Sequence, residues 1–190
     1  MRRVVRPRSD VGDETRVLSQ IYTWALIVRA VAGLLAYAVT LYTDVPLLED
    51  ALFYEEKGYV VAREWLADRS VDLAAESHAV QTAWLFVVVI AVFYYLTAGI
   101  RILPVLFVVY SAVTALVPVY VYRIARELGA PDTAARRAGW LVALSPVFVF
   151  WSGSLYKEGL TLLFLSLGAY HILRLQSDRK STRLNSSHRL

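Results

Sequence analysis

The sequence contains no cysteine, only three histidines and only nine glycines among 190 residues. Without cysteine, disulfide bonds and thiolate metal sites are excluded. No glycine-rich phosphate loop, GxSxG elbow or HExxH motif is present, so the common short signatures of soluble enzymes are absent. His78 stands alone, so a metal site is not indicated. No nucleotide cofactor is expected, while a divalent metal remains open.

Apolar residues are abundant: 57% of the chain is hydrophobic and 13% is aromatic. A soluble domain is typically about 45–50% apolar. The excess lies in blocks separated by charged stretches, which is typical of membrane spans and their loops. The net charge of +4 comes from arginines that flank these blocks instead of forming one basic face. We therefore expect membrane lipid, and not nucleic acid, as a partner.

The predicted fold is all-α, with polytopic transmembrane helices and an external amphipathic helical loop after the first span. The first apolar block, Ile21–Tyr42, would reach ~33 Å as a helix, enough for a bilayer core. Residues 1–20 form a basic N-terminus that is expected in the cytoplasm; its arginines are Arg2, Arg3, Arg6, Arg8 and Arg16. The later apolar blocks are Ala79–Ala98, Ile102–Arg123, Gly139–Trp151 and Leu155–Leu173.

The loop between the first two blocks, residues 43–79, holds nine acids against three bases, a net charge of −6. Its shortage of Lys and Arg favours an external location. Asp50, Tyr54, Gly58, Val61 and Trp65 recur at helical spacing and share one face. The loop is therefore predicted to hold an amphipathic helix on the outer membrane surface.

Two topologies fit the blocks. If every block crosses the membrane, an arginine cluster around the turn at Gly129-Ala130-Pro131 lies outside, against the positive-inside tendency. If Ala79–Ala98 is re-entrant or lies at the outer interface, the cluster becomes cytoplasmic and the chain makes four full crossings and one partial one. The second arrangement is favoured. The cluster consists of Arg123, Arg126, Arg136 and Arg137.

The candidate catalytic residues are Glu49 and Asp50, just beyond the first span. A carboxylate there could act as a general base on an acceptor hydroxyl. The alternative is that Asp50 caps the amphipathic helix, because Asp is favoured at helix N-caps.

Three further positions could contact a phosphate or serve a structural role. Lys157 and Glu158 lie between apolar blocks, where Lys157 could hold a phosphate while Glu158 orients it or the acceptor; interfacial snorkelling is the alternative. Arg101 interrupts two blocks and could meet a lipid phosphate or ordinary head groups. Arg29 lies about 12 Å into the first span, which makes it either a functional residue or a snorkelling one.

The end of the chain has a different character. Residues 178–188 read DRKSTRLNSSH, which resembles the in-frame translation of a sequencing-library adapter. This stretch is polar and has no helical period, so residues 178–190 are taken as a non-native tail and excluded from fold reasoning. On this interpretation the native sequence is a fragment, ending near Ser177; a real cytoplasmic tail is the alternative.

The order of these features resembles the N-terminal part of the GT-C membrane glycosyltransferases that use polyprenyl- or dolichyl-phosphate sugars, such as protein O-mannosyltransferases and aminoarabinose transferases. Three stretches carry the resemblance, which spans roughly Ile21–Leu175. They are the Asp-x-x-x-Tyr motif at Asp50–Tyr54, the YVYRIAR turn at Tyr120–Arg126, and SPVFVFWSGSLYKEG from Ser145.

The resemblance implies an inverting sugar transfer to a glycan, lipid or protein hydroxyl at the external face of the plasma (inner) membrane. It implies that Asp50 is the base, and that Lys157, Glu158, Arg101 and Tyr54 bind the donor phosphate or substrate. Many members carry a second acid where this chain has Ala51; here the second acid is Glu49, so the base could be either residue. The residues alone also allow a transporter or flippase with Arg29, Arg101 and Lys157 along a polar path, or a membrane scaffold without chemistry.

Overall fold

The computed structural model describes the backbone of residues 8–72 and 78–187, and the side chains of residues 12–72, 78 and 80–177. Arg2, Arg3, Arg6 and Glu76 lie outside these ranges. Between its turns the described chain is helical, and it contains no strand, which confirms the all-α prediction for these residues. The helices are α1 (Arg8–Tyr42), α2 (Glu49–Leu66), α3 (His78–Leu96), α4 (Leu103–Thr114), α5 (Leu116–Glu127), α6 (Asp132–Leu144), α7 (Pro146–Gly153) and α8 (Lys157–Ser187).

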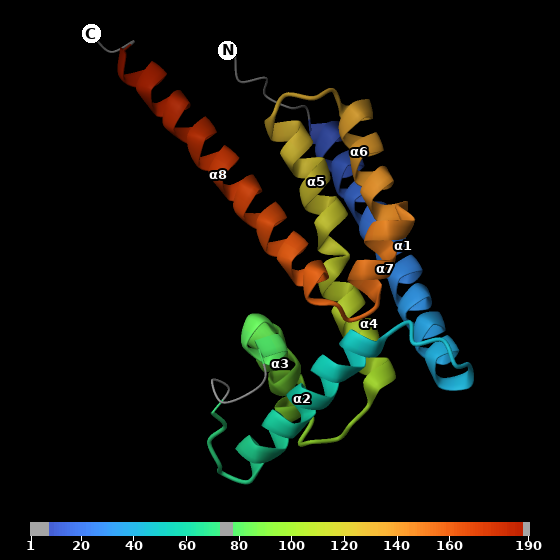
Figure 1. Ribbon diagram of the computed structural model, residues 1–190. Coiled ribbons are helices and arrows are strands. Elements are labelled where there is room, and N and C mark those ends of the chain that lie inside the picture. The colour runs from blue at the N-terminus through green and yellow to red at the C-terminus, as the bar shows by residue number, and fades with distance from the viewer. Residues whose placement is uncertain (1–7, 73–77, 188–190) are drawn as a thin grey trace.

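The helices form an elongated bundle with a smaller helix pair at one end (Figure 1). Helix α1 runs the length of the bundle to the end where α2 and α3 lie. The rod of α4 and α5 returns, α6 and α7 run back towards the α2–α3 end, and α8 returns once more. Helix α3 does not run along the bundle, so four passes connect the two ends, in the order α1, α4–α5, α6–α7 and α8.

Helix breaks follow from local backbone chemistry. Ala98 and Gly99 adopt positive φ angles of 52° and 76°, which end α3 before Arg101. Gly129 has φ of 86° and closes the turn between α5 and α6, as the Gly129-Ala130-Pro131 pattern predicts. Residue 115, between α4 and α5, instead keeps a right-handed backbone (φ −63°, ψ −11°), so these two helices form one rod.

The predicted block Gly139–Trp151 is divided in the structure. Ser145 adopts an extended backbone (φ −61°, ψ 121°), and Pro146 begins α7. The residue before a proline is pushed out of the helical region, and proline cannot donate the bond that would continue the helix. The pass is therefore made by two helices, α6 and α7, and carbonyl groups at the end of α6 need other partners.

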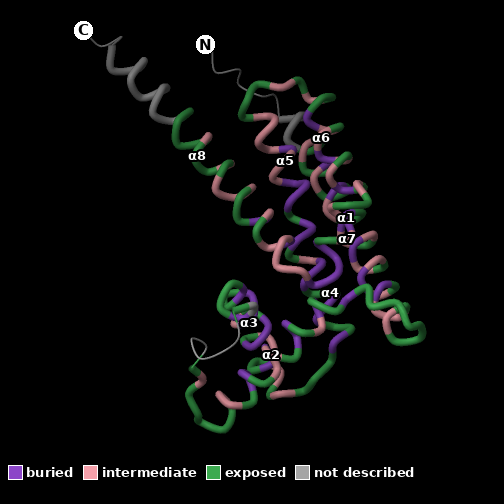
Figure 2. Tube along the Cα trace, viewed as in Figure 1, coloured by how far each residue is buried: buried purple, intermediate pink, exposed green. Residues whose placement is uncertain are grey.

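Two clusters of buried side chains hold the molecule together. One lies at the α2–α3 end and extends into α4, and its centre includes Tyr54, Val87 and Phe107. The other lies towards the opposite end, where Ile21 of α1 meets Tyr122 of α5 and residues of α6. Figure 2 shows buried residues running along the α4–α5 rod, whereas the described part of α8 is largely exposed or half-buried.

Glycines let the helices approach closely where α1 crosses α7. A Cβ atom added to Gly153 would lie 2.5 Å from the backbone oxygen of Arg29, and one on Gly33 would collide with the Gly153 backbone. Such close crossings through small residues are typical of helix pairs in membranes, where van der Waals packing drives association. Gly58 serves the same purpose between α2 and α3, because a Cβ there would meet Ile90.

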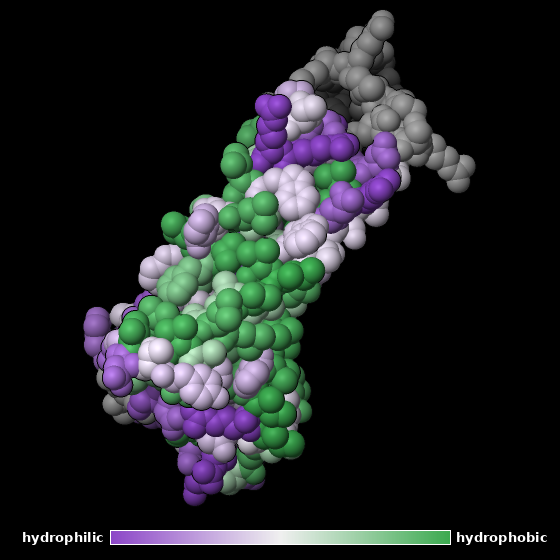
Figure 3. All heavy atoms as spheres, turned by 90° about the vertical axis from the view of Figure 1, so that its right-hand side faces the viewer, coloured by the Kyte–Doolittle hydropathy of each residue, from purple (hydrophilic) through white to green (hydrophobic). Residues whose placement is uncertain are grey.

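Two helical stretches, Gly12–Tyr42 and Leu103–Glu127, are long and apolar enough to cross a bilayer by length and composition. Large apolar side chains on α1 face outwards: Trp24, Val31 and Leu35 expose 53%, 50% and 61% of their surface. Figure 3 shows one face of the molecule, where hydrophobic side chains gather along the middle and hydrophilic ones towards the two ends. Exposure of this extent and pattern marks an interaction surface, including a membrane surface.

The structure corrects two expectations. The apolar face of α2 is covered by α3 instead of lying on a membrane surface: Tyr54, Gly58 and Val61 are buried, and ring pairs join α2 to α3. Helix α8 also continues through residues 178–187, where no helix was expected from the polar sequence. Extending an existing helix adds one hydrogen bond per residue fixed, so it does not require an amphipathic pattern.

Candidate functional site at the junction of α2 and α8

The turn between α7 and α8 meets the segment that leads into α2. The Tyr156 hydroxyl donates a hydrogen bond of 2.9 Å to the Leu47 backbone oxygen, 109 residues away in the sequence. The Tyr110 hydroxyl of α4 donates to the Tyr156 backbone oxygen, and the Trp151 ring lies 4.8 Å from that of Tyr156. Tyr156 therefore joins three parts of the chain at one point.

A strained residue sets the direction of this turn. Leu155 is fully buried and has φ of 60°, a left-handed conformation that bulky residues rarely adopt. The conformation costs about 1–2 kcal/mol and is held by the surrounding core, to which Leu155 belongs. Such strain clusters at functional sites. Here it lets α8 begin directly at Lys157.

Lys157 approaches the aromatic face of α2. Its Nζ lies 5.8 Å from the centre of the Tyr54 ring, within the range of a cation–π contact. The Tyr54 ring is itself fixed by an edge contact with Phe86 of α3, with ring centres 5.9 Å apart. Lys157 and Glu158 form the first turn of α8 and are half-buried. The side chains of α2 and α8 thus converge although about 100 residues separate them.

The electrostatics of Tyr156 place two carboxylates in the same neighbourhood. Burial, followed by the negative charges of Asp50 and Glu158, raises the pKa of the Tyr156 hydroxyl above its ordinary value. A negative charge acts in this way only at short range, because it opposes formation of the tyrosinate anion. Asp50 and Glu158 therefore both act electrostatically on the Tyr156 hydroxyl.

Asp50 is not the N-cap of α2. The cap position is Leu48, and it makes no side-chain capping bond. Glu49 and Asp50 occupy the first helical turn, and both are exposed. A carboxylate in the first turn still interacts favourably with the helix dipole. However, no capping hydrogen bond occupies Asp50, and its carboxylate is accessible at the junction.

A groove runs past Lys157 between α3, α7 and α8. It consists of two hollows of about 520 and 200 Å³, which share Thr82, Lys157 and Thr161. Ligand pockets typically measure about 300–1,000 Å³ and are lined mainly by apolar side chains. Helix α3 breaks next to the groove, where Ala83 leaves the helical region (φ −122°, ψ 15°). Most other lining residues are apolar, among them Trp84, Phe86, Val147, Trp151, Leu160 and Phe164.

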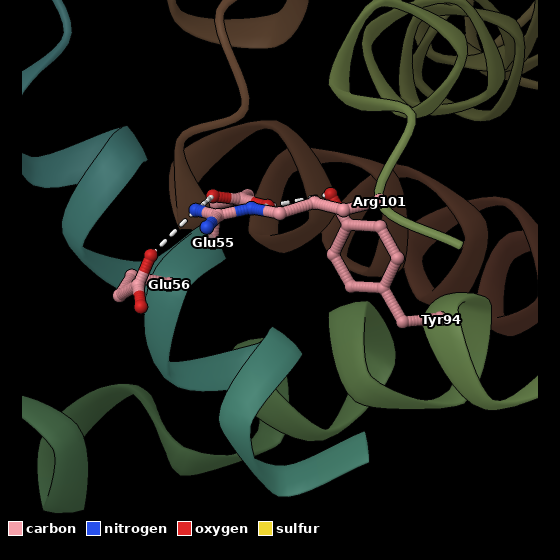
Figure 4. Close-up of polar contacts among 4 residues, drawn as sticks. All are labelled: Glu55, Glu56, Tyr94 and Arg101. Carbon is pink, nitrogen blue, oxygen red and sulfur yellow. Dashed lines mark hydrogen bonds and ion pairs between the residues drawn. The ribbon is translucent and has the colours of Figure 1, made fainter. Parts of the chain in front are cut away.

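Arg101 belongs to a separate cluster, shown in Figure 4. Its guanidinium donates to the fully buried Glu55 carboxylate at 2.9 and 2.5 Å and to Glu56 at 2.5 Å. The Tyr94 hydroxyl donates to Glu55 at 2.6 Å, and the Arg101 guanidinium lies 4.9 Å from the Tyr59 ring. Hydrogen bonds to Glu55 are the main cause that raises the pKa of Arg101. The cluster fastens α2 to α3 and to the segment before α4.

Arg29, in α1, is fully buried, and its guanidinium binds the carbonyl groups at the end of α6. Its Nε donates to the Ser152 hydroxyl at 2.7 Å, and its terminal nitrogens donate to the backbone oxygens of Ala143 at 3.1 Å and Val142 at 3.3 Å. Pro146 has no N–H to offer the Val142 oxygen, so Arg29 supplies the missing donor. A cation at a helix C-terminus is also favoured by the helix dipole. The structure therefore gives Arg29 a packing role.

Among the predicted site residues, Asp50, Tyr54, Lys157 and Glu158 come together at the junction, with Glu49 beside Asp50. Arg101 does not join them. Sequence reasoning missed Tyr156, whose only signal is its position directly before Lys157. It also missed the burial of Glu55, one of the nine acidic residues of the loop at 43–79. Among the described residues, no group of three or more His, Asp or Glu side chains could hold a metal ion.

No protein-family model, curated protein or solved structure matches the chain.

Proposed function

We propose that the chain is the N-terminal, multi-pass membrane part of an inverting glycosyltransferase. It would transfer a sugar from a polyprenyl-phosphate donor to an acceptor hydroxyl on the external face of the plasma membrane. The site would be the junction of α2 and α8, with Asp50 as the base and Glu49 as the alternative base. Lys157, Glu158 and Tyr54 would bind the donor.

A membrane location is supported by the two long apolar helices and by the exposed apolar side chains of α1. The turn between α5 and α6 lies at the same end of the bundle as the start of α1 (Figure 1). Arg123, Arg126, Arg136 and Arg137 flank that turn. The positive-inside tendency then assigns this end to the cytoplasm and the α2–α3 end to the outside.

The chemistry would need few protein groups, because the donor carries its own leaving group. The acceptor oxygen attacks the anomeric carbon, the bond from that carbon to the phosphate oxygen breaks, and the phosphate leaves with the electron pair. The hydroxyl proton passes to the Asp50 carboxylate. Lys157 would balance the negative charge on the departing phosphate, as an ammonium held over the Tyr54 ring can do. Glu158 would orient the donor phosphate or the acceptor.

The groove beside Lys157 supports a lipid-linked donor. Its walls are mainly apolar, with Lys157 as its cation, and it opens between helices that we assign to the membrane. A prenyl chain could lie along such a wall while its phosphate meets Lys157. Holding the donor at the membrane in this way turns the transfer into a reaction between positioned groups.

The observation that carries the proposal is the contact of the turn before α8 with the start of α2: Tyr156 donates to the Leu47 oxygen, and the Lys157 ammonium lies 5.8 Å from the Tyr54 ring. Asp50 and the pair Lys157–Glu158 are the residues that the sequence predicts to take part in the transfer. Their proximity requires the fold to bring the α7–α8 turn to the segment that leads into α2.

The test is sugar transfer by the longest open reading frame that contains the chain, measured in membranes with a radiolabelled polyprenyl-phosphate sugar. Asp50→Asn keeps the size of the side chain and removes its basicity, so transfer should fall by about 10²–10⁴-fold, the usual contribution of a general base. Glu49→Gln is the matched control and should stay within a fewfold of the unchanged protein. Undiminished transfer by both Asp50→Asn and Glu49→Gln removes the assignment, and loss confined to Glu49→Gln moves the base to Glu49.

The transport alternative receives less support. It places Arg29, Arg101 and Lys157 along one polar path. Arg29 instead binds a carbonyl group at the end of α6, and Arg101 is held by Glu55 and Glu56. These three cations have different partners, and two of them are engaged in holding helices together.

A further inference from the structure

A second hollow lies at the opposite end of the bundle from the α2–α8 junction. It is enclosed by the start of α1, the end of α5 and the middle of α8, and measures about 440 Å³. Its cations are Arg123, Arg126 and Arg174, and its carboxylates are Glu14 and Glu127. Three guanidinium groups from two helices therefore face one cavity, at the end that we assign to the cytoplasm.

Aromatic rings hold one of these guanidinium groups in place. The Arg123 guanidinium lies 5.8 Å from the centre of the Tyr120 ring and 5.9 Å from that of Tyr170. The two rings are 5.6 Å apart, so α5 and α8 pack together beneath the cation. A cation–π contact fixes the position of a guanidinium and leaves its N–H donors available.

The other two guanidinium groups also use few of their N–H donors within the protein. Arg126 uses one terminal nitrogen on the Ala130 backbone oxygen at 3.2 Å. Arg174 reaches the Tyr170 hydroxyl at 3.5 Å, which is long for a hydrogen bond. Each guanidinium carries five N–H donors in a planar fork that matches phosphate oxygens. The hollow thus offers a set of preplaced donors for a tetrahedral anion.

The location decides which anion can reach the hollow. Leu18 of α1 forms part of its wall, and the apolar stretch Gly12–Tyr42 includes this part of α1. Tyr170 and Arg174 lie about 20 and 26 Å along α8 from Lys157, close to the thickness of a bilayer core. The hollow is therefore at the depth of lipid head groups in the leaflet opposite the proposed reaction.

We propose that this hollow, the α1–α5–α8 arginine pocket, binds the phosphate of an anionic membrane phospholipid. Arg123, Arg126 and Arg174 receive the phosphate oxygens, and Glu127 at the rim limits the affinity. The bound lipid fills the space where α8 leans away from α5. This site is independent of the chemistry proposed at the other end of the bundle.

The experiment measures lipid retention by the whole chain, using native mass spectrometry of protein released from nanodiscs of phosphatidylglycerol and phosphatidylcholine. The unchanged chain should retain phosphatidylglycerol selectively. The double variant Arg123→Gln/Arg174→Gln should lose about 25-fold in phosphatidylglycerol affinity, from roughly fivefold for each basic residue near an anionic surface. Arg137→Gln, an exposed arginine outside the pocket, is the matched control and should leave retention unchanged.

Glu127→Gln provides a test that does not depend on losing arginines. Removing this carboxylate from the rim should strengthen phosphatidylglycerol retention by about fivefold. Inorganic phosphate at millimolar concentration should not displace the lipid. The proposal is overturned if the double variant retains the lipid fully, if Arg137→Gln loses it equally, if Glu127→Gln leaves retention unchanged or weaker, or if inorganic phosphate displaces it.

Discussion

Arg29 illustrates how a single residue can allow a helix to break inside an apolar bundle. Its charge has no exposed surface and its guanidinium is used on Ser152 and on the last carbonyl groups of α6. Without it, the Val142 and Ala143 oxygens would be buried without a donor, which costs free energy. The same three contacts explain why a charged residue is tolerated at this depth.

Replacing Arg29 with methionine should therefore lower the free energy of unfolding by about 2–4 kcal/mol, because buried carbonyl groups lose charged donors. Lysine should rescue only part of this loss, since its single ammonium cannot serve the hydroxyl and both oxygens together. The measurement is SDS-induced unfolding in micelles, with the exposed Arg137→Met as the control. An unchanged midpoint for Arg29→Met would show that α6 ends without help from this residue.

At the scale of elements, the contact between α1 and α7 depends on the missing side chain of Gly153. A Cβ there would meet the Arg29 backbone oxygen at 2.5 Å, and backbone cannot move aside as a side chain can. Gly153→Ala should destabilise the bundle by about 1–3 kcal/mol, the usual cost of overpacking. Gly168→Ala, on α8, meets nothing within 4 Å and should be neutral or stabilising by up to about 1 kcal/mol.

SDS unfolding of the two alanine variants makes this comparison directly, because both substitutions add the same atom to a helix. Equal effects at the two positions would contradict the close approach of α1 and α7. The double variant should show the sum of both changes, since Gly153 and Gly168 share no partner.

The turn between α5 and α6 is predicted to respond to acid. Burial alone would raise the pKa of the Asp132 carboxyl, but the hydrogen bond from Tyr122 and the charge of Arg136 outweigh it and lower the pKa below 3.8. The stabilisation is therefore complete above pH 3.8 and is lost as the pH falls through the lowered value. Between pH 5 and pH 3, the midpoint temperature of thermal unfolding should fall more for the unchanged protein than for Asp132→Asn. Parallel curves for the two proteins would remove Asp132 as a source of acid sensitivity.

At the scale of the whole molecule, the proposed orientation can be tested by thiol labelling, because the chain has no cysteine of its own. Ala134 lies in the first turn of α6, near the arginine-rich turn, and Asp44 follows α1 at the other end; both are exposed. With a membrane-impermeant maleimide applied from outside, Asp44→Cys should react at once. Ala134→Cys should react only after the membrane is permeabilised. The reverse pattern would place α2 in the cytoplasm and leave Asp50 without an external donor.

The sequence predicted much of the architecture at this scale. The breaks at Gly99 and Gly129 could be read from glycine and proline chemistry. Helix α3, which covers most of the block Ala79–Ala98, lies at one end of the bundle (Figure 1). The break at Pro146 was not expected, because the apolar pattern runs through it. The burial of Glu55 was not expected either, because its partner Arg101 lies 46 residues away.

The sequence by itself determined the helical class, the apolar stretches and the residues able to take part in chemistry. Hydrophobic periodicity, turn residues and charge each act over a few positions. Only the tertiary structure decided which of those residues meet. Lys157 meets Tyr54 where Tyr156 contacts Leu47, while Arg101 is held by Glu55. These pairings depend on how whole helices pack, and no local pattern records which distant faces will come into contact.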